Sequence, residues 1–339
     1  MRRRLFSCVL FAVLALAPAA GAKPASWALP QIKVVVGAGI MGTDVATFHA
    51  DDPLTRVALE QLVAGLTHQV PVAVASPTAG VTMAGLDARL VNALGLGDTA
   101  KLFQQNAKTA GLAPPSRFGN EAVARLIGLR TNHPASQDSL ELLPTETATR
   151  AEAAYSGAQA LKIGSWAIPS VQQAATTFAL PQLTTWQKRI LQTAVRFIGY
   201  PYIWGGESET KQSPFGPQVH GGFDCSGFVW RVYKLERYAG AEQLAGTLQG
   251  RTTYVMSGEV PKAKRVPFAK LQPADVIFFG AHGPSSKPSE VDHMGIYLGN
   301  GWFIHSSGYG VAVAQLSGWY RARFAWARRP LAEAGLSGL

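Results

Sequence analysis

The order of secondary-structure patterns after residue 186 constrains the fold of this chain most strongly. A helical pattern over 187–198 is followed by a glycine-rich loop and by a second helical pattern from about Cys225 to Arg237. Four short β-like runs then follow one another, at 275–279, 293–298, 302–305 and 320–327. Helices that precede a series of neighbouring strands are typical of an α+β domain, in which helices pack on an antiparallel sheet.

Residues 23–165 differ in composition from the second half. Alanine and leucine are frequent there, and apolar residues recur at helical spacing. Pairs of a hydroxyl residue and an arginine precede apolar runs at 55–56 and 149–150, and a fainter pair lies at 116–117. A polar residue before such a run is a helix start signal, and its recurrence predicts diverged helical repeats. We therefore expect an all-α region, followed by a proline-containing linker at 166–185.

The glycines at 37–42 match the G-x-G-x-x-G pattern of dinucleotide-binding folds and follow an apolar run. That motif requires a βαβ unit and an acidic residue about 20 positions further on. Pro53 and a new helix start follow instead. We expect a loop between two helices at this point and no nucleotide as a partner.

The first 22 residues have the pattern of a signal peptide. Arginines at 2–4 are followed by an apolar run at 5–16 and by small residues at 20–22, so we expect cleavage after Ala22 and a secreted protein. A membrane anchor is the alternative reading, although a span needs about 20 apolar residues. The arginines leave open whether the general or the twin-arginine pathway exports the chain.

The charge of the chain is strongly positive. Its formal value is +10, and it falls to +7 once the three N-terminal arginines are removed. This charge fits a soluble basic protein, and it also fits attraction to an anionic cell-wall polymer. The sequence has no basic, aromatic-rich stripe, so nucleic acid is not an expected partner.

Cys225 is the only cysteine outside the predicted signal peptide, because Cys8 lies within it. An unpaired cysteine in an exported protein indicates a reactive thiol, a bridge to another chain or an inert buried residue. Apolar residues at 228–233 follow Cys225 at helical spacing, which places it in the first turn of a helix. Backbone N–H groups and the helix dipole favour a thiolate at such a position.

Two histidines lie on either side of a hairpin signal. His293 begins one β-like run, His305 ends the next, and Gly-Asn-Gly at 299–301 predicts a turn between them. The two rings are therefore expected side by side, one as a base for the thiol and the other orienting it. Zinc binding is the competing use of paired histidines, but the site offers no further cysteine.

Five short sequence motifs occur in a recognisable order in the second half of the chain. They lie at 200–206, 223–227, 275–279, 293–299 and 304–305. Together they resemble the NlpC-type, papain-like cell-wall cysteine endopeptidases, over residues 186–330. The resemblance implies that Cys225 is the nucleophile, His293 the general base and His305 the orienting residue. It also implies a thioester acyl-enzyme that needs no metal or organic cofactor.

The same resemblance implies that Tyr202, Asp224 and Ser226 line the entry subsite, where a carboxylate recognises the free amine of a peptidoglycan stem peptide. The bond cleaved in that family usually joins the γ-carboxyl of D-glutamate to a diamino acid. Trp204 is expected to pack in the core. Ala274 stands where the family usually has glycine, and the loops at 207–221 and 280–291 are long.

The front of the chain carries a second, partial resemblance. Trp27, the run at 40–42, Phe48 and the run at 51–56 resemble an S-layer homology repeat. That resemblance implies that Arg56 and the corresponding Arg150 help to hold an acidic wall polymer. The alternative is that each arginine only packs near its helix start.

The expected plan has four parts: a signal peptide (1–22), a helical wall-binding domain (23–165), a linker (166–185) and a peptidase domain (186–339). Two other functions remain open at this stage. One is a wall-binding protein with a blocked hydrolase domain, and the other is an amidase or acyltransferase acting on another amide.

Overall fold

The computed structural model describes residues 25–336, so the predicted signal peptide lies outside the described part. An antiparallel sheet of five strands forms the centre of the second half, in the order β8-β7-β6-β5-β9. Its strands are β5 (Val276–Gly280), β6 (Val291–Gly299), β7 (Trp302–Ser307), β8 (Gly310–Gln315) and β9 (Phe324–Arg328). The predicted runs correspond to β5, β6, β7 and β9, whereas β8 was not predicted.

Two helices of this half were expected and are present. Helix α8 (Thr185–Arg196) begins at a capping box between Thr184 and Gln187. Helix α9 (Cys225–Trp230) continues through a π-helical turn, η2 (Arg231–Leu235), and packs against β6 and β7. The shorter helices are α10 (Thr253–Gly258), α11 (Gly318–Arg323) and α12 (Pro330–Glu333). Because α11 takes up 318–323, the last predicted strand begins later than expected.

The long loop before Cys225 contains two small antiparallel pairs. Strand β1 (Glu207–Ser208) pairs with β4 (Gly222–Phe223), and β2 (Gln212–Ser213) pairs with β3 (Gly216–Pro217). Single 3₁₀ turns complete the chain: η1 (Ala135–Leu140), η3 (Glu242–Gly246), η4 (Lys262–Lys264), η5 (Phe268–Lys270), η6 (Gly283–Ser285) and η7 (Pro288–Glu290).

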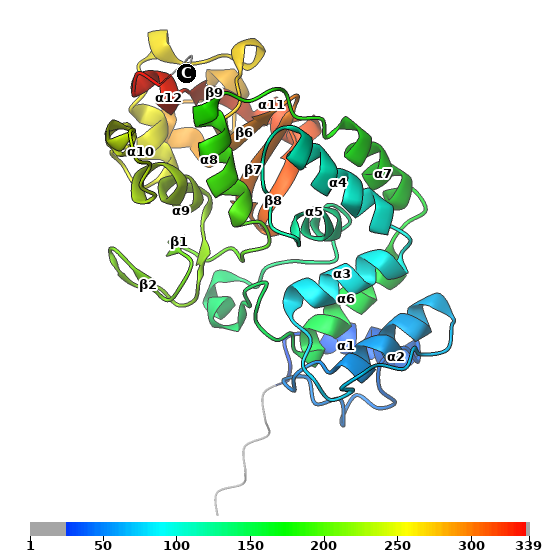
Figure 1. The fold of residues 1–339 in the computed structure, drawn as a ribbon. Helices are drawn as coiled ribbons and strands as arrows, with labels where there is room; N and C mark the ends of the chain where they lie inside the picture. The colour runs from blue at the N-terminus through cyan, green and yellow to red at the C-terminus, as the bar shows by residue number, and fades with distance from the viewer. Residues whose placement is uncertain (1–24, 337–339) are drawn as a thin grey trace, which may run out of the picture.

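The first half is helical, as expected from its composition and from the helical spacing of its apolar residues. Its helices are α1 (Leu29–Gly37), α2 (Arg56–Thr67), α3 (Met83–Ala93), α4 (Gly97–Thr109), α5 (Phe118–Leu126), α6 (Arg150–Lys162) and α7 (Ala167–Thr177). The glycine pattern at 37–42 marks the end of α1 and the loop that follows, as predicted. In Figure 1 this half begins with the blue α1 and α2, and it reaches the sheet through α5, which contacts β8.

Three of these helices start around a closed ring of backbone hydrogen bonds. Leu54 donates its N–H to the carbonyl of Ala148 (2.7 Å), Ala148 donates to Val81 (2.8 Å), and Val81 donates to Leu54 (2.9 Å). The next residue of each segment is a threonine that caps α2, α3 or α6. The ring therefore joins three segments that are far apart in the sequence at one point.

These three helices begin with the same kind of cap. Thr55, Thr82 and Thr149 each accept a backbone N–H from the residue three positions on. The fainter phrase at 116–117 does not belong with them, because α5 begins at Phe118 without a side-chain cap. The third start is instead Thr82, which methionine rather than arginine follows, so the hydroxyl–arginine pattern could not reveal it.

The two halves share one hydrophobic core. Phe178, just after α7, has its ring centroid 5.1 Å from that of Phe103 on α4 and 5.1 Å from that of Trp302 on β7. The segment at 166–185, expected to be a linker, thus contains a helix and a fully buried aromatic residue. The domain limits given above remain a prediction.

Ala274 adopts φ = 69°, in the left-handed region that favours glycine. Its N–H donates to the carbonyl of Tyr297 (2.8 Å), which anchors the turn before β5. An L-residue in this conformation costs about 1 kcal/mol, so the backbone of this turn is strained at Ala274. Across residues 25–336, no helix has both the length and the hydropathy that a membrane span requires.

Candidate active site

Cys225 is the first residue of α9, as the sequence predicted. Asp224 caps this helix, with its Oδ1 accepting the N–H of Gly227 at 2.5 Å. The thiol is 7% exposed, and its Sγ lies 3.4 Å from Oγ1 of Thr253. The backbone N–H of Met294, on β6, also bonds to the sulfur. The thiol therefore sits where the start of α9 meets the strand that carries His293.

The resting thiol is not acidic, contrary to the expectation from its place at a helix start. Burial raises the pKa of Cys225 to about 11, and the nearby Asp224 carboxylate adds to this rise. Hydrogen bonds from Thr253 and from backbone N–H groups oppose the shift but do not reverse it. Loss of hydration of the thiolate outweighs the helix start in this structure.

His293 on β6 and His305 on β7 lie side by side, as the hairpin pattern predicted. Nε2 of His293 is 2.7 Å from Nδ1 of His305. Burial lowers the pKa of His293 to about 4, and burial together with His293 lowers the pKa of His305 well below its usual value. Both rings are therefore neutral near pH 7, and Nδ1 of His293 is the nitrogen outside the His–His hydrogen bond.

Aromatic rings surround the two histidines. Phe279 stacks on His293 with centroids 5.7 Å apart, and Phe303 lies 4.6 Å from His305. Tyr320 on α11 contacts both rings, at 6.4 Å from His293 and 5.3 Å from His305. These rings remove water from the imidazoles, which explains their low pKa values. Tyr320 was not predicted as part of the site, since its segment was taken as a strand.

An arginine that the sequence did not predict, Arg251, forms hydrogen bonds with two residues of the predicted entry subsite. Ser226 Oγ donates to Asp224 Oδ1 at 2.9 Å, while Arg251 Nη1 lies 3.2 Å from that oxygen and 2.8 Å from Ser226 Oγ. Arg251 Nε also donates to Oε2 of Glu207 at 2.8 Å. Asp224, Glu207 and Arg251 together carry one net negative charge. Tyr202, half-buried beside them, has its pKa raised mainly by burial.

A cavity of about 520 Å³ opens at this arginine, and Trp204, Glu207, Asp224 and Ser226 line it together with Arg251. Trp204 is 74% exposed, so the expectation that it packs in the core is wrong. Oε1 of Glu207 is buried and has no hydrogen-bond partner within residues 25–336. The cavity therefore combines the exposed ring of Trp204 with the charged groups of Glu207, Asp224 and Arg251.

The helical half holds the loop that carries Tyr202. Asn132 Nδ2 donates to the carbonyl of Tyr202 at 3.0 Å, and Oδ2 of Asp138 accepts the N–H of Trp204 at 2.9 Å. Arg125 on α5 donates to the carbonyl of Gly199 at 2.8 Å. Residues of the first half thus hold the backbone of the loop that carries Tyr202.

Arg56 and Arg150 lie at the starts of α2 and α6, in the helical half (Figure 1). Arg150 Nε donates to the carbonyl of Phe48 at 2.8 Å, and its guanidinium lies 4.7 Å from the Phe48 ring centre. Arg56 is exposed, and its Nη1 donates to the carbonyl of Ala75 at 3.2 Å. Both arginines pack near their helix starts, and their role in polymer binding stays a prediction.

No cluster of three or more His, Cys, Asp or Glu in the described residues is arranged to hold a metal ion.

Comparison with known proteins gives a family match for the second half. Residues 199–329 match the model of the NlpC/P60 family. "Probable peptidoglycan endopeptidase LytE" of Bacillus subtilis (strain 168) is 30% identical over 142 residues, which are 42% of this chain and 34% of that protein. "Gamma-D-glutamyl-L-lysine dipeptidyl-peptidase" of the same strain is 30% identical over 129 residues, 38% of this chain and 34% of that protein. "Murein DD-endopeptidase MepH" of Escherichia coli (strain K12) is 33% identical over 135 residues, 39% and 41% of the two chains.

Solved structures of the family are also similar to part of this chain. An NlpC/P60 family protein from Bacillus cereus is 27% identical, with a TM-score of 0.33, and the match covers 45% of this chain and 42% of that one. The NlpC/p60 domain of the peptidoglycan hydrolase SagA is 26% identical, with a TM-score of 0.30, over 42% and 97% of the two chains. The chain spans about a third of the length of the first two curated relatives.

Proposed function

We propose that this chain, whose residues 199–329 form an NlpC/P60 domain, is a cysteine endopeptidase that hydrolyses peptidoglycan stem peptides. The observations that carry the proposal are a buried free thiol at the start of α9, which packs against β6, and a histidine on β6 whose Nε2 lies 2.7 Å from Nδ1 of a second histidine. A thiol, a base and a group that orients the base are the parts that acyl transfer by a cysteine requires. The names of the relatives agree, since they describe peptidoglycan endopeptidases.

The first step transfers the thiol proton to His293 as the sulfur attacks. With a thiol pKa of about 11 and an imidazole pKa of about 4, both groups are neutral at rest, so proton transfer accompanies attack. For Nδ1 of His293 to accept the proton, its Nε2 must carry hydrogen and donate to Nδ1 of His305. The carbonyl oxygen becomes negative at this stage, and the backbone N–H of Cys225 is a suitable donor to it.

The second half of the reaction returns the proton. His293 protonates the leaving amine as the C–N bond breaks, which leaves a thioester between Cys225 and the acyl part of the peptide. Water then attacks the thioester, with His293 taking its proton, and the thiol and a free carboxylate result. Each proton in this scheme passes through one nitrogen, Nδ1 of His293.

The bond that we propose is cleaved joins the γ-carboxyl of D-glutamate to a diamino acid. One relative is named for a γ-D-glutamyl-L-lysine bond, and the family resemblance implies the same class. The single net negative charge of Asp224, Glu207 and Arg251 suits the free amine of a stem peptide, because it attracts a cation. Tyr202 and Ser226 complete this entry subsite in the proposal.

The proposed setting is outside the cytoplasm, after cleavage near Ala22. The basic charge of the chain supports retention at an anionic wall, and Arg56 and Arg150 are the proposed contacts to a wall polymer. This part of the proposal depends on the sequence patterns alone.

Product analysis tests the proposal. Purified protein is incubated with a disaccharide tetrapeptide that contains a diamino acid, and with the corresponding tetrapeptide that has a free amine, and the fragments are identified by mass spectrometry. A γ-D-glutamyl endopeptidase releases a dipeptide that begins with the diamino acid. An amidase would instead separate the sugar from an intact tetrapeptide, and no new fragment from either compound would refute the hydrolase proposal.

A further inference from the structure

The segment that follows α5 bonds both the loop that carries Tyr202 and the turn between β7 and β8. Asn132 donates its side-chain Nδ2 to the carbonyl of Tyr202 at 3.0 Å. The backbone N–H of the same residue donates to the carbonyl of Gly308 at 2.9 Å. One residue of the helical half therefore connects the Tyr202 loop (199–204) with the turn that follows His305.

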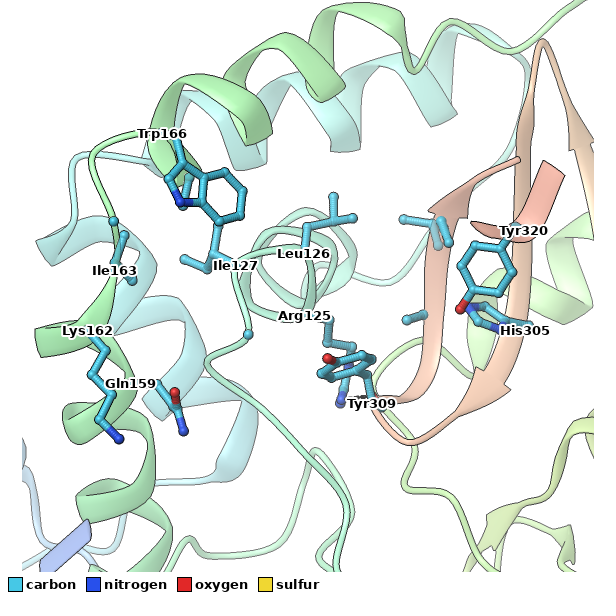
Figure 2. A pocket seen from close by; sticks show the side chains of 16 residues that line it. Arg125, Leu126, Ile127, Gln159, Lys162, Ile163, Trp166, His305, Tyr309 and Tyr320 are labelled. Carbon is cyan, nitrogen blue, oxygen red and sulfur yellow. Dashed lines mark hydrogen bonds between the residues drawn. The ribbon is translucent and has the colours of Figure 1, made fainter. Parts of the chain in front are cut away.

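Arg125, on α5, makes a second connection between the same two parts. Its Nη2 donates to the carbonyl of Gly199 at 2.8 Å, and its Nη1 donates to the carbonyl of Tyr309. Figure 2 shows Arg125 beside Tyr309, where the helical half meets the sheet. The side chain of Arg125 is buried, and its Nη2 lies 3.0 Å from Oε2 of Glu121, so its charge is paired. Because a guanidinium is planar and rigid, it fixes the separation of the two carbonyls that it bonds.

Two glycines provide room for this buried ion pair. A Cβ atom on Gly199 would lie 2.7 Å from the carboxylate of Glu121, and a Cβ atom on Gly310 would lie 3.3 Å from Nη1 of Arg125. Both glycines adopt positive φ angles, 89° and 70°, which favour glycine over a residue with a side chain. The backbone of the second half is therefore shaped for a close approach of Arg125 and Glu121 on both sides.

The turn belongs to a β-hairpin, whereas the Tyr202 loop has no regular structure. Strands β7 and β8 pair from Trp302 to Ser307, so strand hydrogen bonds set the position of His305. Residues 199–204 contain no helix or strand. Removal of a contact from the helical half should therefore move the Tyr202 loop rather than the strand that carries His305.

The position of this loop matters for the proposed function because of Tyr202. Burial raises the pKa of the Tyr202 hydroxyl, and the charges of Cys225 and Asp224 add to the rise, so the side chain lies beside both residues. Tyr202 and Asp224 are parts of the proposed entry subsite for the free amine. A shift of the loop would change how these two side chains face each other, and it would affect binding of the amine more than the chemistry at the thiol.

We propose that Asn132 and Arg125 are positioning residues of the entry subsite, which hold the Tyr202 loop at a fixed place relative to the catalytic strands. The inference rests on the proposed function, because it concerns how a stem peptide with a free amine is bound. The helical half thereby takes part in substrate binding without touching the substrate. Loss of either contact should raise KM for such a peptide and leave kcat nearly unchanged.

Asn132→Ala removes the side-chain bond to Tyr202 and keeps the backbone bond to Gly308. In the full chain, KM for a stem tetrapeptide with a free amine should rise about tenfold, with kcat within about twofold of the wild type. Asn106→Ala is the matched control, because Nδ2 of Asn106 donates to the carbonyl of Ala175 (3.2 Å) inside the helical half. Equal KM changes in the two variants, or a fall in kcat with KM unchanged, would overturn the inference.

A second pair of variants separates the guanidinium from its charge. Arg125→Lys keeps the positive charge but cannot hold both carbonyls in one plane, so it should raise KM about tenfold. Glu121→Gln removes the negative charge but leaves both carbonyl bonds of Arg125 in place, so KM should stay within about twofold of the wild-type value. Both variants are assayed well below their thermal unfolding midpoints. A KM increase for Glu121→Gln that equals or exceeds that for Arg125→Lys would contradict the proposal.

Amide hydrogen exchange gives a readout that needs no turnover. Asn132→Ala should increase exchange about tenfold in the peptide that covers 199–204, while Asn106→Ala leaves that peptide unchanged. Unchanged exchange in both variants would show that Asn132 does not hold the loop, and would overturn the inference. If the wild type cleaves no stem peptide, the proposed function fails, and exchange still decides whether the helical half positions the Tyr202 loop.

Discussion

Nε2 of His293 and Nδ1 of His305 lie 2.7 Å apart on neighbouring strands. This contact occupies Nε2 of His293 and leaves Nδ1 as the nitrogen that, in the proposed reaction, accepts the thiol proton. His305→Ala should therefore lower kcat/KM by about 10²-fold or more, because a positioned general base contributes about 10²–10⁴-fold. The measurement is steady-state hydrolysis of a stem peptide.

His305→Asn is the control for this contact. An asparagine side chain can place a polar atom near the position of Nδ1, so this variant should keep more activity than His305→Ala. Equal loss in the two variants, with both proteins folded, would show that the hydrogen bond has no role in positioning His293.

The protonation states of His293 and Cys225 determine how activity and thiol alkylation should depend on pH. With His293 near pKa 4 and Cys225 near 11, kcat/KM should rise through about pH 4 and stay level across neutral pH. Alkylation of Cys225 by iodoacetamide should be slow at pH 7 and should increase about tenfold per pH unit toward pH 10. An alkylation rate that is already maximal at pH 6 would indicate a thiolate–imidazolium pair instead.

The lowered pKa of His293 also predicts how the free energy of unfolding depends on pH. The pKa of His293 is lower in the folded chain than the ordinary value of 6.5, so the unfolded chain binds more protons between pH 4 and 6.5. Stability from this group is therefore present above pH 6.5 and is lost as the pH falls toward 4. Replacement of His293 by glutamine should make the unfolding midpoint less sensitive to pH in that window.

Arg251 should matter for stability as well as for substrate binding. Its removal leaves Glu207, 2% exposed, without its cation and weakens the surroundings of Asp224. Arg251→Ala should reduce the free energy of unfolding by about 2–3 kcal/mol, measured by urea denaturation. Arg251→Lys keeps the charge but loses the planar fork, so it should recover only part of the loss. Full stability of Arg251→Ala would contradict the pairing.

The ring at the helix starts can be tested through its caps. Thr55→Ala, Thr82→Ala and Thr149→Ala should each lower the free energy of unfolding by about 1 kcal/mol, because each loses a capping hydrogen bond. Ser116→Ala is the comparison, since it lies before a helix without a side-chain cap and should change stability by less than about 0.5 kcal/mol. A cost for Ser116→Ala equal to that of Thr82→Ala would contradict the capping role of the three threonines.

The parts of the fold with a clear local pattern were predictable. The hairpin turn at 299–301 and the helix start at Cys225 follow from turn chemistry and apolar spacing, and both are where the sequence places them. Strand β8 was missed, because Gly-Val-Ala-Val-Ala-Gln has small residues and follows a glycine-containing turn. Helix α7 was missed because two prolines suggested a linker, although Pro169 lies in the first turn, where proline is tolerated.

The site shows the limit of local patterns more clearly. Arg251 reaches Asp224 from 27 residues away, and Tyr320 reaches the histidines from a helix that looked like a strand. The sequence around Arg251 or Tyr320 does not predict these contacts, because they arise from tertiary packing. The thiol pKa was likewise misjudged, because a helix start is visible in sequence whereas burial of the sulfur is not.

Turnover by Cys225→Ala is the most direct test of the account. The full chain and this variant are incubated at equal concentration with the same stem tetrapeptide that has a free amine, and the released dipeptide that begins with the diamino acid is quantified by mass spectrometry. The account predicts that the variant folds with an unchanged circular dichroism spectrum and loses at least about 10³-fold in rate. Cleavage of the same bond by both proteins at equal rates would contradict it.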